Sequence, residues 1–138
     1  MSKIQIKHPD KSVTTGAYSD GILIDGWLYI SGQGPLDLST GEVKHGTIEE
    51  ETLLTLSHIE KIITAAHGSI DDIVKCTVHL SDINDFERFN AAYSSFFPAV
   101  KPARTTVQSV LTDGIKIEID AIARIHHDRV KEKDKRIL

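Results

Sequence analysis

The segment IKIEIDAIA, residues 115–123, alternates apolar side chains with other side chains at a period of two. One set of alternate positions holds isoleucines and alanines, and the other holds Lys116, Glu118, Asp120 and Ile122. This alternation is typical of a β-strand with one face in a core. The fold must therefore cover one side of a sheet, and the other side is left to water or to a partner subunit.

A hairpin is predicted near the start of the chain. Residues 17–24 and 27–32 are two apolar runs joined by Asp25-Gly26, a pair that readily adopts the positive φ angles of a tight turn. A short additional strand can be placed near residues 4–7.

Two more strands are expected in the second half of the chain. Residues 71–80 have alternating apolar positions, and the PAR motif of residues 102–104 opens a strand that could pair with residues 115–123. The predicted apolar face of the first of these strands holds Val74, Cys76, Val78 and Leu80.

Between the strands, two segments have helical periodicity. Thr47 and Glu50 have the spacing of a capping box, the apolar stripe that follows runs to Ala66, and Gly68 is expected to end the helix. The corresponding residues of the second helix are Asn84 and Glu87 for its capping box, and Phe86, Phe89, Tyr93 and Phe96 or Phe97 for its buried face.

This order of elements predicts the α+β class, with two helices on one face of a mixed sheet. The 138 residues are expected to form a single domain, residues 1–138, because no linker or repeat divides them. From about residue 126 to residue 138 the chain mixes basic and acidic side chains, as a solvated tail does.

Composition excludes several classes of protein. A net charge of −4 argues against a nucleic-acid-binding surface, which needs a clustered basic patch. No apolar run is long enough to cross a membrane, and the first residues lack the apolar centre of a signal peptide, so a cytoplasmic protein without a membrane partner is expected. Cys76 is the single cysteine, which fits a reducing compartment.

Few side chains have the spacing of a reactive site. The seven histidines form no metal-binding pair, Cys76 lies on an apolar strand face, and no serine-nucleophile motif is present, so neither a metal nor a reactive thiol is expected. Arg104 fits a surface residue, a subunit salt bridge or a clamp for a substrate carboxylate. Glu118 fits an exposed strand residue or a carboxylate that positions or deprotonates water, and Asn90 fits a polar residue that binds a neighbouring loop.

Three stretches begin GAYSDGILIDG, DDIVKCTVHLSDINDFERFN and KPARTTVQ, and together they span nearly the whole chain. These stretches resemble the RidA/YjgF family of enamine and imine deaminases, some members of which carry the label endoribonuclease L-PSP. The resemblance implies a chorismate-mutase-like α+β sandwich. It also implies a homotrimer with a central barrel and with active sites between the subunits, which would cover the open sheet face.

The resemblance also assigns roles to individual residues. Arg104 matches the family arginine that binds the substrate carboxylate, and Glu118 matches the glutamate that positions water. The residues that match the remaining substrate-binding positions are Tyr18, Ser31, Asn90 and Thr106. The chain departs from the family pattern twice, because Thr106 stands where many deaminases have a cysteine and Gly34 replaces a branched residue.

The implied activity is the hydrolysis of reactive 2-imino or 2-enamino acids, such as 2-aminoacrylate, to 2-keto acids and ammonia. No cofactor is needed, because the substrate is already electrophilic and the protein has only to orient it and stabilise charge. Two alternatives stay open. One is a ribonuclease or translation inhibitor, and the other is a trimer that binds a small ligand or a protein without turnover.

Overall fold

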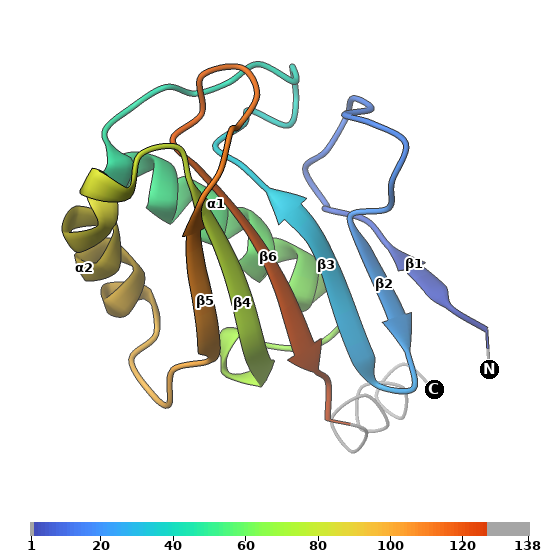
Figure 1. Cartoon of the computed structure of the whole chain (residues 1–138). Helices are drawn as coiled ribbons and strands as arrows, with labels where there is room; N and C mark the ends of the chain where they lie inside the picture. The colour runs from blue at the N-terminus through green and yellow to red at the C-terminus, as the bar shows by residue number, and fades with distance from the viewer. Residues whose placement is uncertain (1, 127–138) are drawn as a thin grey trace.

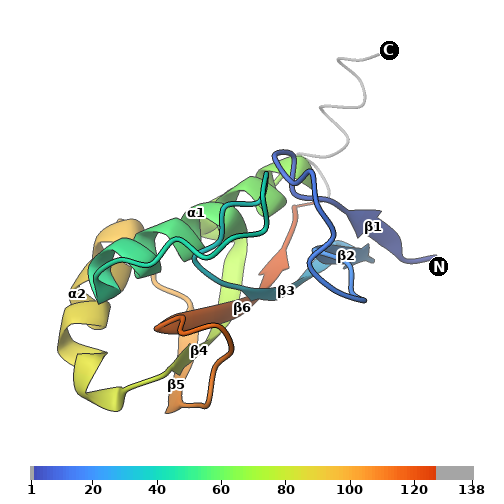
Figure 2. The same cartoon turned by 90° about the horizontal axis from the view of Figure 1, so that it is seen from above.

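The computed structural model describes residues 2–126, which form a six-stranded mixed sheet with both helices on one side of it (Figure 1; Figure 2). The strands are β1 Ile4–Ile6, β2 Gly21–Ile24, β3 Trp27–Gln33, β4 Ile73–Leu80, β5 Ala103–Gln108 and β6 Ile117–Arg124. The helices are α1 Ile48–Ala65 and α2 Phe86–Phe96, with short 3₁₀ turns at Ile70–Asp72 and Ile83–Asp85. The α+β class is confirmed, and the predicted polar tail lies outside the described residues from position 127 onward.

The strand order is β1-β2-β3-β6-β4-β5. The prediction that the strand after the PAR motif could pair with the last strand is wrong, because β4 lies between β5 and β6. β4 and β5 are parallel, and parallel neighbours need a long crossover, which the chain through α2 supplies. The loop from 109 to 116 then passes β4 before β6 enters the sheet.

The β2–β3 hairpin is confirmed, but β2 begins at Gly21 and not at residue 17 as predicted. Asp25 has φ 52° and Gly26 has φ 80°, so both central residues are left-handed, as a type I′ turn requires. Ile24 and Trp27 are register partners on either side of this turn. The turn sequence therefore fixes the register of the first half of the sheet.

The capping box of α1 is also confirmed at its N-terminus. The Thr47 side chain accepts a hydrogen bond from the Glu50 amide, and the Glu50 carboxylate accepts one from the Thr47 amide. At the other end, His67 and not Gly68 is the left-handed residue, with φ 65°. Gly68 is needed for packing instead, because a Cβ there would lie 2.4 Å from the Ile125 Cδ1 atom.

The start of α2 differs from its prediction. Asp82 caps a 3₁₀ turn by accepting a hydrogen bond from the Asn84 amide, and the α-helix begins only at Phe86. The proposed capping box of Asn84 and Glu87 is therefore wrong. Asp82 already satisfies the first free amide, so the chain reaches the helix through a turn of tighter pitch.

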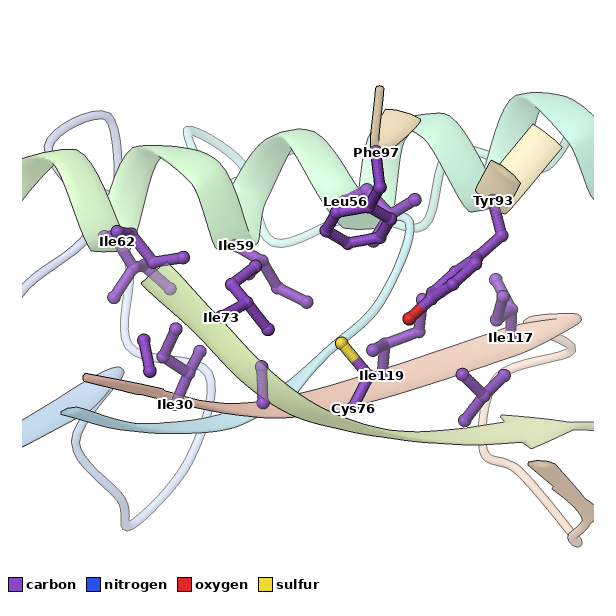
Figure 3. Close-up of a cluster of buried hydrophobic side chains, with 14 of the residues drawn as sticks. Ile30, Leu56, Ile59, Ile62, Ile73, Cys76, Tyr93, Phe97, Ile117 and Ile119 are labelled. Carbon is purple, nitrogen blue, oxygen red and sulfur yellow. The ribbon is translucent and has the colours of Figure 1, made fainter. Parts of the chain in front are cut away.

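The core lies between α1, α2 and the covered face of the sheet, as Figure 3 shows. Leu56, Ile59 and Ile62 point from α1 toward Cys76 and Ile119 on the strands. Burial raises the pKa of the Cys76 thiol, so it stays protonated and packs as a small apolar group.

Val74 is the residue of the covered face that was predicted incorrectly. The register of β4 against β6 shifts between Ile73 and Lys75, which is a β-bulge. This shift buries Ile73 and leaves Val74 42% exposed. A one-residue bulge cannot be seen in a strict alternation, so the sequence pattern placed the wrong neighbour in the core.

The opposite face of the sheet is open in the isolated chain. Trp27, Tyr29 and Val107 are exposed large apolar side chains of its strands, and Glu118 and Asp120 lie on the same face. This mixed surface matches the predicted uncovered face. Within residues 2–126 no helix has both the length and the apolar character to cross a membrane.

Candidate functional site

The predicted site residues divide between the two faces of the sheet. Arg104 is the register partner of Cys76, whose side chain is in the core, so Arg104 points toward the helices. Glu118 lies between Ile117 and Ile119, which are fully buried, so Glu118 points toward the open face. The two groups of the predicted mechanism therefore cannot meet within one chain.

Three aromatic rings and an amide hold Arg104. Its guanidinium carbon lies 4.7 Å from the ring centre of Tyr93, 5.2 Å from that of Phe89 and 5.6 Å from that of Phe86. Its Nη1 atom donates a hydrogen bond to the Asn90 Oδ1 atom at 2.9 Å. We call these four residues around Arg104 the arginine cage. α2 supplies all four of them, so the aromatic periodicity of that helix also places the arginine.

No carboxylate of residues 2–126 forms an ion pair with Arg104. The predicted alternative of a salt bridge between subunits is a separate question, which a single chain does not test. A cavity of about 320 Å³ opens at the cage, and it contains a second cation, Lys101. We call it the cationic cavity, and its lining residues are Asn90, Tyr93, Ser94, Lys101, Pro102 and Arg104.

Two buried hydroxyl groups lie near the cage. Thr106 follows Arg104 on the same face of β5, and its Oγ1 atom is buried without a hydrogen-bond partner among the described residues. The Tyr93 Oη atom is buried too, and the Cys76 thiol is its neighbouring polar group. Burial raises the pKa of the Tyr93 phenol, so it remains a neutral hydrogen-bonding group.

Tyr18, Ser31 and Glu118 meet in a different cavity, of about 390 Å³, which we call the acidic cavity. It lies at the end of the sheet where three loops approach one another, namely residues 7–20, 34–47 and 109–116 (Figure 1).

Two features of β3 shape the acidic cavity. β3 shifts register against β6 between Ile30 and Gln33, so Ser31 and Gly32 form a bulge beside Glu118. A Cβ at Gly32 would lie 2.8 Å from the Glu118 Oε2 atom. Sequence reasoning missed Gly32, although the SGQ motif contains it, because its role depends on this close approach.

The hydroxyl groups of the acidic cavity are partly engaged. The Ser31 hydroxyl donates to the carbonyl oxygen of Ser19 at 2.6 Å, which leaves its lone pairs free to accept from a ligand. The Tyr18 hydroxyl is bonded to the Thr15 side chain. Gly34 also lines the cavity, and a Cβ there would lie 3.3 Å from the Ile115 Cδ1 atom, so the glycine widens the wall.

The fold is thus an α+β sandwich with two candidate binding cavities, one cationic and one acidic. Residues 9–125 match the family model described as Endoribonuclease L-PSP. The chain belongs to this family, which is the RidA/YjgF family that its three motifs predicted.

Relatives are similar over most of their length. A RutC family protein of Saccharolobus solfataricus is 44% identical over 110 residues, which is 79% of this chain and 87% of that protein. The 2-iminobutanoate/2-iminopropanoate deaminase of Rattus norvegicus is 41% identical over 109 residues, covering 78% of this chain and 80% of the relative. The crystal structure of E. coli TdcF with bound serine superposes with a TM-score of 0.82 at 33% identity, covering 89% of this chain and 99% of that one.

Proposed function

We propose that the protein hydrolyses 2-imino acids and their enamine tautomers to 2-keto acids and ammonia. The observation that carries this proposal is the arginine cage, which holds a cation without a carboxylate partner among residues 2–126. A planar guanidinium fixed in this way is suited to bind a carboxylate through two N–H groups. The bound serine of TdcF and the name of the rat relative support a substrate of the amino-acid class.

In this mechanism the substrate carboxylate binds Arg104, and Glu118 accepts a proton from a water molecule. The water oxygen adds to the imine carbon, and the proton held by Glu118 passes to the nitrogen, which gives a carbinolamine. The carbinolamine hydroxyl then gives its proton, through Glu118, to the nitrogen. The carbon–oxygen double bond forms as the carbon–nitrogen bond breaks, so ammonia leaves and the keto acid remains. Asn90 holds the guanidinium, Thr106 lies beside it, and the Tyr18 and Ser31 hydroxyls bind the substrate from the acidic cavity. No redox cofactor is required, since no electrons are transferred.

Because the sheet separates Arg104 from Glu118, a complete site needs two copies of the chain. We propose that the open face is covered in a homotrimer, in which the cationic cavity of one protomer meets the acidic cavity of the next. Each of three interfaces would then hold one site. The exposed Trp27, Tyr29 and Val107 side chains favour such burial, since apolar groups gathered on a sheet face commonly mark an interface.

The test combines an assay with a mass measurement. Ammonia and keto-acid formation from 2-iminopropanoate generated in the assay should exceed the rate in free water, and analytical ultracentrifugation should give the mass of a trimer. A trimer without turnover would favour the binding alternative. RNA cleavage that falls with salt would favour the ribonuclease alternative, although the net charge of −4 argues against it.

Cys76 should be dispensable for turnover. The thiol is fully buried in the core, and Cys76→Ala should lower the free energy of unfolding by about 1 kcal/mol, as small core truncations do. Denaturant unfolding and the ammonia assay on the same preparation would measure both effects. A well-folded alanine variant with no turnover would contradict the inert role. Cys76→Ser is a poorer test, because a buried hydroxyl is destabilising in itself.

A further inference from the structure

Two histidines that are 50 positions apart in the sequence meet in the structure. The His8 Nε2 atom lies 3.0 Å from the His58 Nδ1 atom, and the residues are only 3% and 7% exposed. His8 lies in the loop after β1, whereas His58 lies on α1. Neither residue has a part in the proposed reaction.

The hydrogen bonds of this pair fix the position of each ring proton. The Asp10 amide donates to the His8 Nδ1 atom at 3.1 Å, so this nitrogen carries no proton. The His8 Nε2–H group therefore donates to the His58 Nδ1 atom. The His58 Nε2–H group in turn donates to the carbonyl oxygen of Leu36 at 2.8 Å. Each ring nitrogen thus has one partner, and this arrangement is possible only when both rings are neutral.

The pair joins α1 to two loops that form the acidic cavity. The loop of residues 7–20 carries Tyr18, and it is held at its base by the hydrogen bond from the His8 amide to the Asp20 carboxylate at 2.8 Å. The loop of residues 34–47 carries Leu36, which lines the same cavity. The two loops also touch directly, since the Ser12 amide donates to the Leu38 carbonyl oxygen at 3.0 Å.

An additional proton is incompatible with this chain of hydrogen bonds. A proton on the His8 Nδ1 atom would face the Asp10 N–H group, and a proton on the His58 Nδ1 atom would face the His8 Nε2–H group. Either change places two donors against each other in a buried site, and one bond must then break.

Some charged groups around the pair raise the pKa values of the two rings and others lower them. Asp10 and Asp20 face His8 and Asp37 lies near His58, and these carboxylates favour a positive ring, whereas Lys61 opposes it. Lys11 neutralises Asp20 through an ion pair of 2.6 Å. Burial is the largest influence, and together with the neighbouring His58 it lowers the pKa of His8 to about 4, while burial also lowers the pKa of His58.

We propose that His8 and His58 are positioning residues that fasten the Tyr18 loop and the Leu36 loop to α1, and that protonation of either ring releases this wall of the acidic cavity. The closed loops bind protons more weakly than the open loops, in which a histidine has its ordinary pKa of about 6.5. The closed state is thus fully favoured above that pH. The free-energy advantage of the closed state is lost as the pH falls from about 6.5 toward the lowered pKa of His8, near 4.

Hydrogen–deuterium exchange as a function of pH tests this proposal in the intact protein. The probes are backbone amides whose bonds depend on the loops, namely those of Asp10, Ser12, Asp37 and Lys44. The exchange rates are first corrected for their intrinsic pH dependence. The equilibrium constant for loop opening should then rise by about tenfold per pH unit below 6.5 for every proton that the open loops take up. Amides in the middle of α1 should stay protected over the same range.

His8→Gln and His58→Gln each remove one titrating ring and should reduce the acid-dependent rise in exchange, and the double variant should abolish it. His45→Gln is the matched control, because His45 is exposed, and it should behave like the unaltered protein. The proposal is overturned if the loop amides of the unaltered protein show no acid-dependent opening, or if either buried-site variant keeps the full rise.

A second measurement needs no substitution. Nitrogen NMR of the imidazole rings at pH 7 should show both His8 and His58 as neutral rings protonated at Nε2, and proton uptake should begin only well below pH 6.5. A ring that is already charged at pH 6.5, or protonated at Nδ1, would overturn the assignment. Neither experiment uses an imine, so these results and the outcome of the deaminase assay are independent.

Discussion

Replacement of Glu118 by glutamine is expected to lower turnover of a 2-imino acid by about two to four powers of ten, the usual value of general acid–base assistance. The amide keeps the shape of the side chain beside the Gly32 backbone, but it cannot accept a proton from water. Substrate affinity should change much less, because the carboxylate of the substrate binds a different residue. Steady-state and single-turnover rates would separate the chemical step from binding.

Asp120→Asn is the matched control for this experiment. Asp120 lies two residues further along β6 on the same open face, and its Oδ2 atom is 3.8 Å from the His79 Nε2 atom. Loss of an exposed pair of this kind typically lowers the free energy of unfolding by up to about 1 kcal/mol, and Asp120 has no part in the proposed reaction, so the rate should change far less than in the Glu118 variant. A Glu118→Gln protein that turns over at the native rate would reduce Glu118 to a structural residue.

Arg104→Ala should lower kcat/KM for carboxylate-bearing imines by at least about thirtyfold. Removal of one partner from a desolvated, hydrogen-bonded charge pair costs about 2–5 kcal/mol, and about 1.4 kcal/mol corresponds to a factor of ten. Arg104→Lys should recover only part of this loss, because an ammonium group cannot bind a carboxylate through a planar pair of N–H groups. The ammonia assay over a range of substrate concentrations provides the comparison.

Arg88→Ala is the matched control for Arg104→Ala, because it also removes an arginine, but from the exposed surface of α2. Arg88 lies on α2 and makes an exposed ion pair with Glu49 at 2.7 Å, so its removal should leave turnover almost unchanged. Sedimentation should give the same mass for both variants. Full activity in a well-folded Arg104→Ala protein would refute the carboxylate clamp, while loss of assembly would assign Arg104 to the interface.

Local features of the fold were predictable because neighbouring residues determine them. The Asp25-Gly26 turn and the Thr47–Glu50 capping box each depend on a few adjacent side chains, and both are present as predicted. The two helices on one side of the sheet follow from the same local periodicities. The site was predicted as a set of residues, through the family motifs, and not as a geometry.

Features that depend on distant parts of the chain could not be read from a pattern. Nothing in the spacing of Arg104 and Glu118 shows that β4 separates their strands, since strand order is decided by packing of the whole sheet. The bulge that exposes Val74 could not be predicted for the same reason. His8 and His58 look unrelated in the sequence, because the fold alone brings residues 50 positions apart into contact.

The position of the sheet between the two charges has a genetic consequence. In the proposed trimer, an allele that damages the arginine cage and an allele that damages the acidic cavity impair opposite halves of each site. A cell that expresses both would assemble mixed trimers in which one of the interfaces joins an intact half from each parent. Two inactive alleles of this gene should therefore complement each other, whereas two alleles with damage on the same side of the sheet should not.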